Sequence, residues 1–368
     1  NPLLKWYYLV EVRGMIKRRL IWLAAAAALI GAFFALRKSR AVMNAVNDAA
    51  LKVKGVLAAA CSPVRFSVGE MLIVLAVIAA LVFIVCAVIA IIKNRGSRLK
   101  TLARRALLAA DVVLTVAVII NFTLGASYYA DGFSEREGIT PRGATVAELR
   151  DLTEEFTYIL NDKAGGVPRG EDGQMLMSAD EIIDRAAGVY AEAEKEFPSL
   201  AGSERRAKKM TFSRIMSLLG YTGVYMPYTG EANVNVDFPA AYLPDTVAHE
   251  LAHQRGVASE DEANFAAIVA GLTCGDPVYE YSAALSAWSE LGIALCGYDR
   301  EAYFELYATL DPGVQADIVA SNEYWAQFQG PVREASDRVY DAFLKSYGES
   351  NGIKTYNMVV GLLLAYYG

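Results

Sequence analysis

Residues 71–92 read MLIVLAVIAALVFIVCAVIAII, a run of 22 apolar residues without a charge. About 20 apolar residues let a helix cross the hydrocarbon core of a bilayer, so this run predicts a transmembrane helix. The composition agrees, because 54% of the residues are hydrophobic and the mean hydropathy is +0.26. Such a composition excludes intrinsic disorder and fibrous repeats.

Two further apolar runs flank this one. Residues 20–36 form a short run, and residues 106–127 form a longer run that Asp111 interrupts. Both predict transmembrane helices, which together with the central run make a three-helix membrane anchor over residues 1–130. For the first run a cleaved signal peptide is the alternative, because basic residues at 17–19 precede a short apolar core.

Asp111 lies about one helical turn inside the third run. An acid within a membrane span is a functional candidate by default. The alternative, which we favour, is an ion pair with Arg104 or Arg105 of the preceding basic loop.

Charge divides the chain into two parts. Residues 1–105 carry 17 Lys and Arg against 3 acids, whereas residues 106–368 carry 18 against 38. Six of the basic residues lie in the short segment 93–105, and loops this basic remain in the cytoplasm. We therefore predict a multi-pass membrane protein with a cytoplasmic N-terminus, an outer loop at 37–70 and an extracytoplasmic domain at 131–368.

The outer loop 37–70 has apolar side chains at helical spacing up to Ser62-Pro63. This pattern predicts an amphipathic helix that lies on the membrane surface or on the outer domain. At the other end of the chain, the apolar run 358–367 is too short to span a membrane and predicts a helix packed on the core.

The outer domain is expected to be mainly α with a small sheet. Amphipathic patterns predict helices from Thr145, from 178 to 197 behind a capping box, and around 204–219. Residues 220–239 are rich in Gly, Tyr, Val and Asn and predict one or two strands with turns. Helical patterns then continue nearly to the C-terminus.

The only two histidines of the chain, His249 and His253, lie in the sequence Val-Ala-His-Glu-Leu-Ala-His-Gln. Residues i and i+4 of a helix share a face, so both imidazoles can bind one metal ion. Glu250, directly after the first histidine, can act as general base on a water molecule at that ion. Asp245 is the expected N-cap of this helix and Gly256 its left-handed C-terminal residue.

A catalytic zinc site has three protein ligands and one open position. The next segment, Ser-Glu-Asp-Glu-Ala-Asn, begins another helix and offers three acids. Glu260 and Asn264 are four residues apart on one face, which predicts Glu260 as third ligand and Asn264 as a group that supports a histidine. Glu262 is better explained as the partner of Ser259 in a capping box, and Asp261 as a solvent-exposed residue. The alternative for Glu260 is an acid favoured at a helix start by the helix dipole.

These residues resemble the gluzincin pattern, in which a Glu on a later helix completes a zinc site and an Asp or Asn one turn further supports a histidine. The chain as a whole resembles a bacterial membrane family catalogued as domain of unknown function 3810. The resemblance rests on the stretches 63–69, 230–235, 249–256, 260–265, 352–356 and 362–366. It implies a zinc metallopeptidase of the bacterial cell membrane with a zincin-like α+β domain.

The spacing departs from better-known gluzincins, because only six residues separate His253 from Glu260. This spacing is closer to that of metzincins, whose conserved glycine would match Gly256 and whose third histidine would be replaced near Ser259. The assignment of Glu260 therefore stays open to a test by structure.

We expect Zn²⁺ as cofactor and a peptide or protein as substrate, with Glu250 as the base. An extended peptide is expected along an edge strand within 230–237, where backbone hydrogen bonds hold any sequence. Asn233 and Asn235 are candidate substrate contacts, or else ordinary polar residues of the strand. A tyrosine that assists the oxyanion is expected, but the sequence does not select one among Tyr225, Tyr228, Tyr279 and Tyr281.

The expected function is a membrane-anchored zinc metallopeptidase that hydrolyses peptide bonds outside the cytoplasm. The alternative is a non-catalytic zinc-containing ectodomain that binds an envelope partner or a peptide. Glu250 disfavours that alternative, because a structural zinc site needs no base. An intramembrane protease is disfavoured by the polar residues that flank the motif.

Other classes of chemistry have no motif in the chain. It contains no P-loop, no GxGxxG after a strand and no GxSxG, so nucleotides and nucleic acids are not expected as partners. CxxC is also absent, which disfavours a thiolate zinc site. Cys274 and Cys296 are expected as free thiols, with a disulfide in an oxidising exterior as the alternative.

Overall fold

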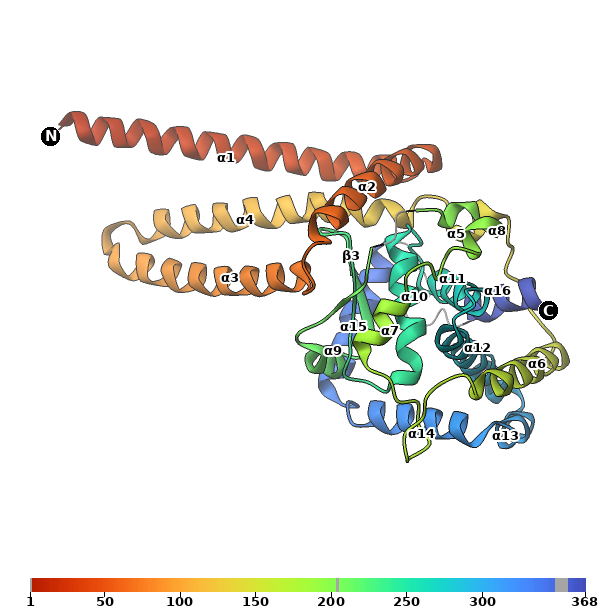
Figure 1. Ribbon diagram of the computed structural model, residues 1–368. Helices are drawn as coiled ribbons and strands as arrows, with labels where there is room; N and C mark the ends of the chain where they lie inside the picture. Colours follow the sequence, from red (N-terminus) through yellow and green to blue (C-terminus); the bar gives the residue numbers. More distant parts are fainter. Residues whose placement is uncertain (1, 203–204, 348–356) are drawn as a thin grey trace. The chain divides into compact units, whose positions relative to one another are not determined.

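The computed structural model describes residues 2–202, 205–347 and 357–368 (Figure 1). The chain divides into two compact units, of which the first comprises Asn1–Ala50 and Glu70–Ala130. The second comprises Leu51–Gly69 and Asp131–Gly368. Residues 51–69 thus belong to the second unit, and the membrane anchor expected over residues 1–130 stays a prediction.

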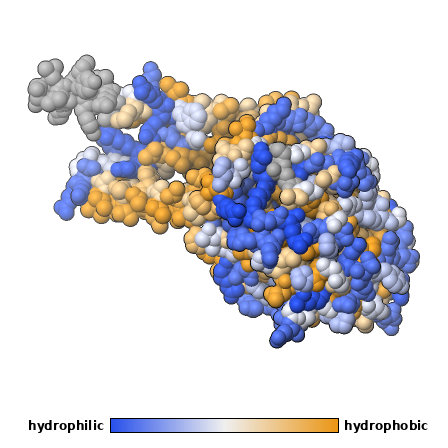
Figure 2. Space-filling model, in the orientation of Figure 1, coloured by the Kyte–Doolittle hydropathy of each residue, from blue (hydrophilic) through white to orange (hydrophobic). Residues whose placement is uncertain are grey.

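The first unit is built from long apolar helices, as the three hydrophobic runs predicted. Among the described residues, three helices are long and apolar enough to cross a membrane. The first is Gly14–Leu36, which is part of α1 (Pro2–Leu36). The second is α3 (Val68–Lys93). The third is Arg95–Thr123, which contains α4 (Arg98–Thr123). Figure 2 shows apolar side chains along the outside of α3.

Asp111 of α4 pairs with α1 rather than with its own loop. Its Oδ2 lies 2.8 Å from Nη1 of Arg19. One turn further along, Nε1 of Trp22 donates a hydrogen bond of 2.9 Å to Oγ1 of Thr115. The expectation of an ion pair is therefore confirmed in kind, but the partner is Arg19 instead of Arg104 or Arg105. Because α1 lies beside α4, a residue 92 positions earlier reaches the acid.

Two shorter segments behave as their patterns predicted. The loop 37–70 contains the helix α2 (Arg40–Cys61), which ends directly before Ser62-Pro63. Near the C-terminus, α16 (Asn357–Tyr367) buries Leu362 and Leu363 completely in the core of the second unit. The stretch 352–356, used above for the family resemblance, lies outside the described residues.

Helices make up most of the second unit. In chain order they are α5 (Phe133–Glu137), α6 (Val146–Ala164), α7 (Ala179–Arg185), α8 (Ala193–Glu196), α9 (Ser213–Leu219), α10 (Leu243–Gln254), α11 (Glu260–Thr273), α12 (Pro277–Tyr298), α13 (Arg300–Ala308), α14 (Pro312–Ala326) and α15 (Pro331–Ser346), before α16. The helix expected from 178 to 197 is wrong in extent. Its capping box of Ser178 and Glu181 is present, but α7 ends at Arg185. The chain then turns so that Tyr190, which is fully buried, reaches the Ala248 carbonyl of α10 with its hydroxyl.

A small sheet lies beside α10 within the second unit (Figure 1). Within the described residues it has three strands in the order β1-β3-β2, namely β1 (Lys208–Lys209), β2 (Gly223–Met226) and β3 (Glu231–Val234). β3 is parallel to β1 and antiparallel to β2, with Gly223 opposite Val234. The expectation of an edge strand within 230–237 is therefore wrong. That segment forms the central strand, and β2 is the edge strand next to α10.

Candidate metal centre

The helix that carries both histidines begins and ends at well-defined signals. α10 starts at Leu243 with Pro244 in its first turn, where the missing N–H of proline leaves no helical hydrogen bond unmade. Ala248, Leu251 and Ala252 are at most 1% exposed and anchor one face of the helix in the core. His249 and His253 lie on the neighbouring face of the helix, with side chains that are 14% and 12% exposed.

The C-terminus of α10 forms a Schellman motif that also fixes one histidine. Gly256 has φ +97°, its N–H bonds to the His253 carbonyl, and the Val257 N–H bonds to the Ala252 carbonyl. The Val257 carbonyl lies 2.7 Å from Nδ1 of His253. A carbonyl can only accept, so Nδ1 of His253 carries the proton, and its Nε2 is free to bind a metal ion when the ring is neutral.

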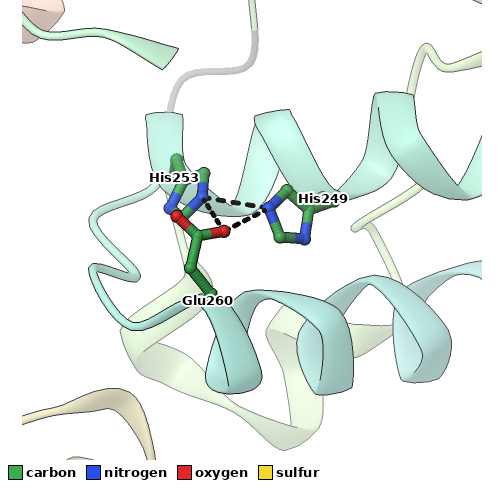
Figure 3. A group of neighbouring side chains, drawn as sticks. All are labelled: His249, His253 and Glu260. Carbon is green, nitrogen blue, oxygen red and sulfur yellow. Dashed lines mark hydrogen bonds and ion pairs between the residues drawn. The ribbon is translucent and has the colours of Figure 1, made fainter. Parts of the chain in front are cut away.

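Three side chains converge at this place (Figure 3). Nε2 of His249 and Nε2 of His253 are 3.1 Å apart, and Oε2 of Glu260 lies 3.1 Å and 3.5 Å from them. Glu260 is the first residue of α11, which packs against α10. Donors bound to one tetrahedral zinc ion at about 2.1 Å are about 3.4 Å apart, so the observed separations fit such an ion. Two imidazole nitrogens and one carboxylate oxygen are also a donor set that zinc accepts.

The charges of the group favour a cation. Burial alone lowers the pKa of His253, but the negative charge of Glu260 and its hydrogen bond outweigh this effect and raise the pKa to about 9. Burial alone raises the pKa of Glu260, but the charge of His253 and the hydrogen bonds of both histidines hold it well below the ordinary value. The carboxylate therefore stabilises positive charge in the space between the rings, whether a proton or a metal ion supplies it.

Glu250 lies beside this group with its carboxyl buried. The residue is 3% exposed, its Oε2 has no hydrogen-bond partner among the described residues, and burial raises its pKa to about 8. The carboxyl occupies the space where a side chain on Gly223 of β2 would lie. The edge strand therefore approaches the acid closely because residue 223 has no Cβ.

One tyrosine contacts the centre directly. The hydroxyl of Tyr340, on α15, donates a hydrogen bond of 2.5 Å to Oε1 of Glu260. The two oxygens of Glu260 thus have different partners, the histidines on one side and Tyr340 on the other. No spacing in the sequence singles out Tyr340, because it lies 80 positions after Glu260 on a helix with an ordinary amphipathic pattern.

Comparisons with known proteins identify the family but not an activity. Residues 50–364 match the family described as protein of unknown function (DUF3810). The chain belongs to the DUF3810 family. Neither a curated protein nor a solved structure matches the chain. The resemblance seen in the sequence is therefore confirmed for the family, and the metal centre of this DUF3810 protein has to be judged by its own geometry.

Several acids of the DUF3810 chain lie elsewhere than the sequence predicted. Glu262 does not cap α11, since Ser259 makes no side-chain cap hydrogen bond there. Its carboxylate instead accepts hydrogen bonds from Phe133 and Ser134 at the start of α5. Asp261 is buried at 7% exposure, not exposed to solvent.

The expected N-cap of the motif helix is also wrong. Asp245 lies in the first turn of α10, whose N-cap is Tyr242. Burial raises the pKa of Asp245 to about 7, and its N–H donates to Oγ of Ser282 on α12. The position of Asp245 thus depends on the contact between α10 and α12. A local sequence pattern does not predict a contact between two helices.

The predicted supporting and substrate residues have different surroundings. Asn264 is half-buried, and neither histidine has a recorded hydrogen bond to it among the described residues, so its role stays a prediction. Asn233 and Asn235 are fully buried, and their amides donate to the Glu231 carbonyl and to Tyr221 and Ser217. Both amides therefore brace the sheet, and a contact of either residue with substrate stays a prediction.

The four tyrosines named as oxyanion candidates differ in their position relative to the histidines. Tyr279 and Tyr281 are fully buried and bond to the Ile182 carbonyl and to Asp317, away from the histidines. The hydroxyl of Tyr228 donates to the Gly69 carbonyl, at 3.3 Å. Tyr225, on β2, has its ring centroid 6.5 Å from that of His253. Of the four, Tyr225 is thus the one beside the centre.

The cysteines take no part in the metal centre. Cys61, Cys86, Cys274 and Cys296 are all free thiols. The expectation of free thiols at Cys274 and Cys296 is confirmed. Burial raises the pKa of Cys274 to about 11, which keeps this thiol protonated and unreactive near neutral pH.

Proposed function

We propose that this DUF3810 protein is a membrane-anchored zinc peptidase whose second unit hydrolyses peptide bonds outside the cytoplasm. The observation that carries the proposal is the convergence of His249, His253 and Glu260 beside the buried carboxyl of Glu250. A structural zinc site usually has four protein ligands, whereas a catalytic site has three and leaves one position open. The three donors found here fit the catalytic kind.

Glu250 has the properties of a general base for hydrolysis. When bound, zinc supplies Lewis acidity, which lets water attack a carbonyl near neutral pH. Glu250 would take the proton from the attacking water and pass it to the leaving amine. A base works best when its pKa is near the working pH, and burial already brings the pKa of Glu250 to about 8.

The edge strand β2 offers a place for an extended substrate. β2 pairs with β3 on one side, and among the described residues no strand pairs with its other edge. A peptide added to that edge would form backbone hydrogen bonds independent of its side chains. Because Gly223 lies against Glu250, a peptide bond held at this end of β2 would come next to the base. This contact supports a peptide substrate over a small molecule.

The side of the membrane follows from the basic residues. The basic segment that runs from the end of α3 into the first turns of α4, with Arg95, Arg98, Lys100 and Arg104, favours the cytoplasm. An odd number of spans would then carry the second unit to the outer side. We propose a bacterial cell membrane, as the family resemblance implies.

The full-length protein in detergent tests the proposal. It should contain about one zinc per chain by elemental analysis. It should also cleave a protein substrate such as casein, or a mixed peptide library, detected by mass spectrometry. Glu250→Gln should keep the metal and lower the cleavage rate about 10²- to 10⁴-fold, because it removes only the base. The matched control is Glu290→Gln, since Glu290 is another acid whose pKa burial raises to about 7.

Three outcomes would contradict the proposal. Wild-type protein without zinc after metal loading would exclude the metal centre. Equal cleavage by the wild type and the Glu250→Gln variant would show that a contaminating protease is the source. Zinc without any cleavage would favour a non-catalytic domain that binds a partner in the cell envelope.

A further inference from the structure

Tyr340 contacts the metal centre through Glu260. Its hydroxyl bonds to Oε1 of Glu260 at 2.5 Å, whereas Oε2 of the same carboxylate faces His249 and His253. A carboxylate can bind a metal ion through one oxygen or through both. The hydrogen bond from Tyr340 occupies the oxygen that a second bond to the ion would need.

The position of the Tyr340 ring is itself fixed by neighbouring side chains. It packs edge-to-face on Tyr221, with the ring centroids 5.8 Å apart and the planes at 87°. The hydroxyl of Tyr221 lies 3.3 Å from Oγ of Ser336, one helical turn before Tyr340 on α15. Tyr221 lies two residues before the edge strand β2. The ring of Tyr340 therefore packs on Tyr221, which is itself linked to α15 through Ser336.

We infer that Tyr340 is a positioning residue that keeps Glu260 bound to the metal ion through one oxygen and thereby leaves a coordination position for substrate. The inference rests on the metal centre proposed above and adds a role for a helix 80 residues downstream. Groups that hydrogen-bond to metal ligands orient them, and their loss lowers metal affinity about 10- to 100-fold. Without the Tyr340 hydroxyl, Oε1 of Glu260 is free to turn toward the ion.

The test uses cobalt, which reports both affinity and coordination number. Full-length protein in detergent is stripped with a chelator and titrated with Co²⁺, while the visible absorption is recorded. Four-coordinate Co²⁺ absorbs more strongly than five- or six-coordinate Co²⁺. Tyr340→Phe should bind Co²⁺ about tenfold more weakly, because Glu260 is no longer oriented. Its visible band should also be weaker, because Glu260 then supplies two oxygens.

Two further variants make the result specific. Tyr366→Phe is the matched control, because it removes another Tyr–Glu hydrogen bond, 2.8 Å to Glu196, at the surface. It should leave the affinity and the spectrum unchanged. In a Glu260→Ala background, Tyr340→Phe should have no additional effect on Co²⁺ affinity, because Tyr340 acts through that carboxylate.

The outcomes distinguish this inference from the proposed function. If Tyr340→Phe binds Co²⁺ with the affinity and the spectrum of the wild type, the positioning role is wrong while the metal centre stands. A loss of affinity that persists unchanged in the Glu260→Ala background would also overturn it, because Tyr340 would then act on the fold. If the wild type binds no Co²⁺, the metal centre fails and this inference fails with it.

Discussion

Two buried glutamates of the second unit, Glu250 and Glu262, have opposite surroundings. Each is 3% exposed. Glu262 accepts hydrogen bonds of 2.6–2.9 Å from the N–H groups of Phe133 and Ser134 and from the Ser134 hydroxyl. Glu250 has one oxygen without a partner among the described residues, and burial raises its pKa to about 8.

The difference in hydrogen bonding separates an acid with a structural role, Glu262, from the acid proposed as the base, Glu250. A buried carboxylate that accepts several hydrogen bonds recovers the free energy lost on leaving water. A buried carboxylate without them remains costly and is found mostly where a protein needs a proton acceptor or a metal ion. Glu262 therefore joins α5 to α11, whereas Glu250 lies uncompensated beside the histidines, as its proposed role as a base requires.

The largest effect is expected when the structural acid is removed. Glu262→Ala leaves buried donors of Phe133 and Ser134 unsatisfied, which should lower the free energy of unfolding by about 4 kcal/mol. The midpoint of thermal unfolding should fall by roughly 8–16 °C, measured by intrinsic fluorescence of the detergent-solubilised protein. Zinc bound per folded chain should not change. Glu192→Ala removes an exposed acid and is the control. An equal fall in the unfolding midpoint of both variants would contradict the structural role of Glu262.

The sequence predicted the metal centre well where the chemistry is local. His249 and His253 follow from helical spacing, and Gly256 from the rule for helix C-termini, because both depend on a few adjacent residues. Glu260 was also accessible, since α11 starts within a short loop of α10. The three helices long and apolar enough to cross a membrane followed from length and composition alone.

The remaining features depend on contacts between distant segments. Glu262 was assigned to its own helix because a capping box is a local pattern, yet its donors lie about 130 residues earlier. Arg19 pairs with Asp111, and Tyr340 contacts Glu260, across similar distances in the chain. No local pattern predicts such partners, because they are set by how helices pack. The prediction of an edge strand within 230–237 failed for the same reason.

A smaller effect is expected from moving the reactive acid without removing it. A side chain on Gly223 would overlap the carboxyl of Glu250, so Gly223→Ala should displace that carboxyl. A displacement of about 1 Å can lower the rate about 10²-fold, and the zinc content should stay at the wild-type value. Gly165→Ala is the control, since nothing lies within 4 Å of its added Cβ. Full activity of Gly223→Ala would place the working position of Glu250 away from β2.

The smallest effect concerns two buried lysines in different surroundings. Lys208 and Lys54 are each 4% exposed. Lys208 forms an ion pair with Glu231 and bonds to the Cys61 carbonyl. Lys54 lies with Nζ 5.6 Å from the ring centroid of Tyr225, and burial lowers its pKa from 10.5 to about 8. Lys54 is therefore the buried cation whose charge destabilises the fold.

The sign of the pH dependence follows from this shift. Between pH 8 and 10.5 the unfolded chain binds more protons at Lys54 than the folded chain, so this residue makes the free energy of unfolding rise with pH. Lys54→Met should be more stable than the wild type by roughly 2 kcal/mol at pH 7, and the difference should shrink toward pH 10. Chemical unfolding at both pH values measures it. Lys52→Met, on the exposed face of the same helix, is the control and should show no such change. If the stability difference between Lys54→Met and the wild type is the same at both pH values, packing and not charge causes the effect.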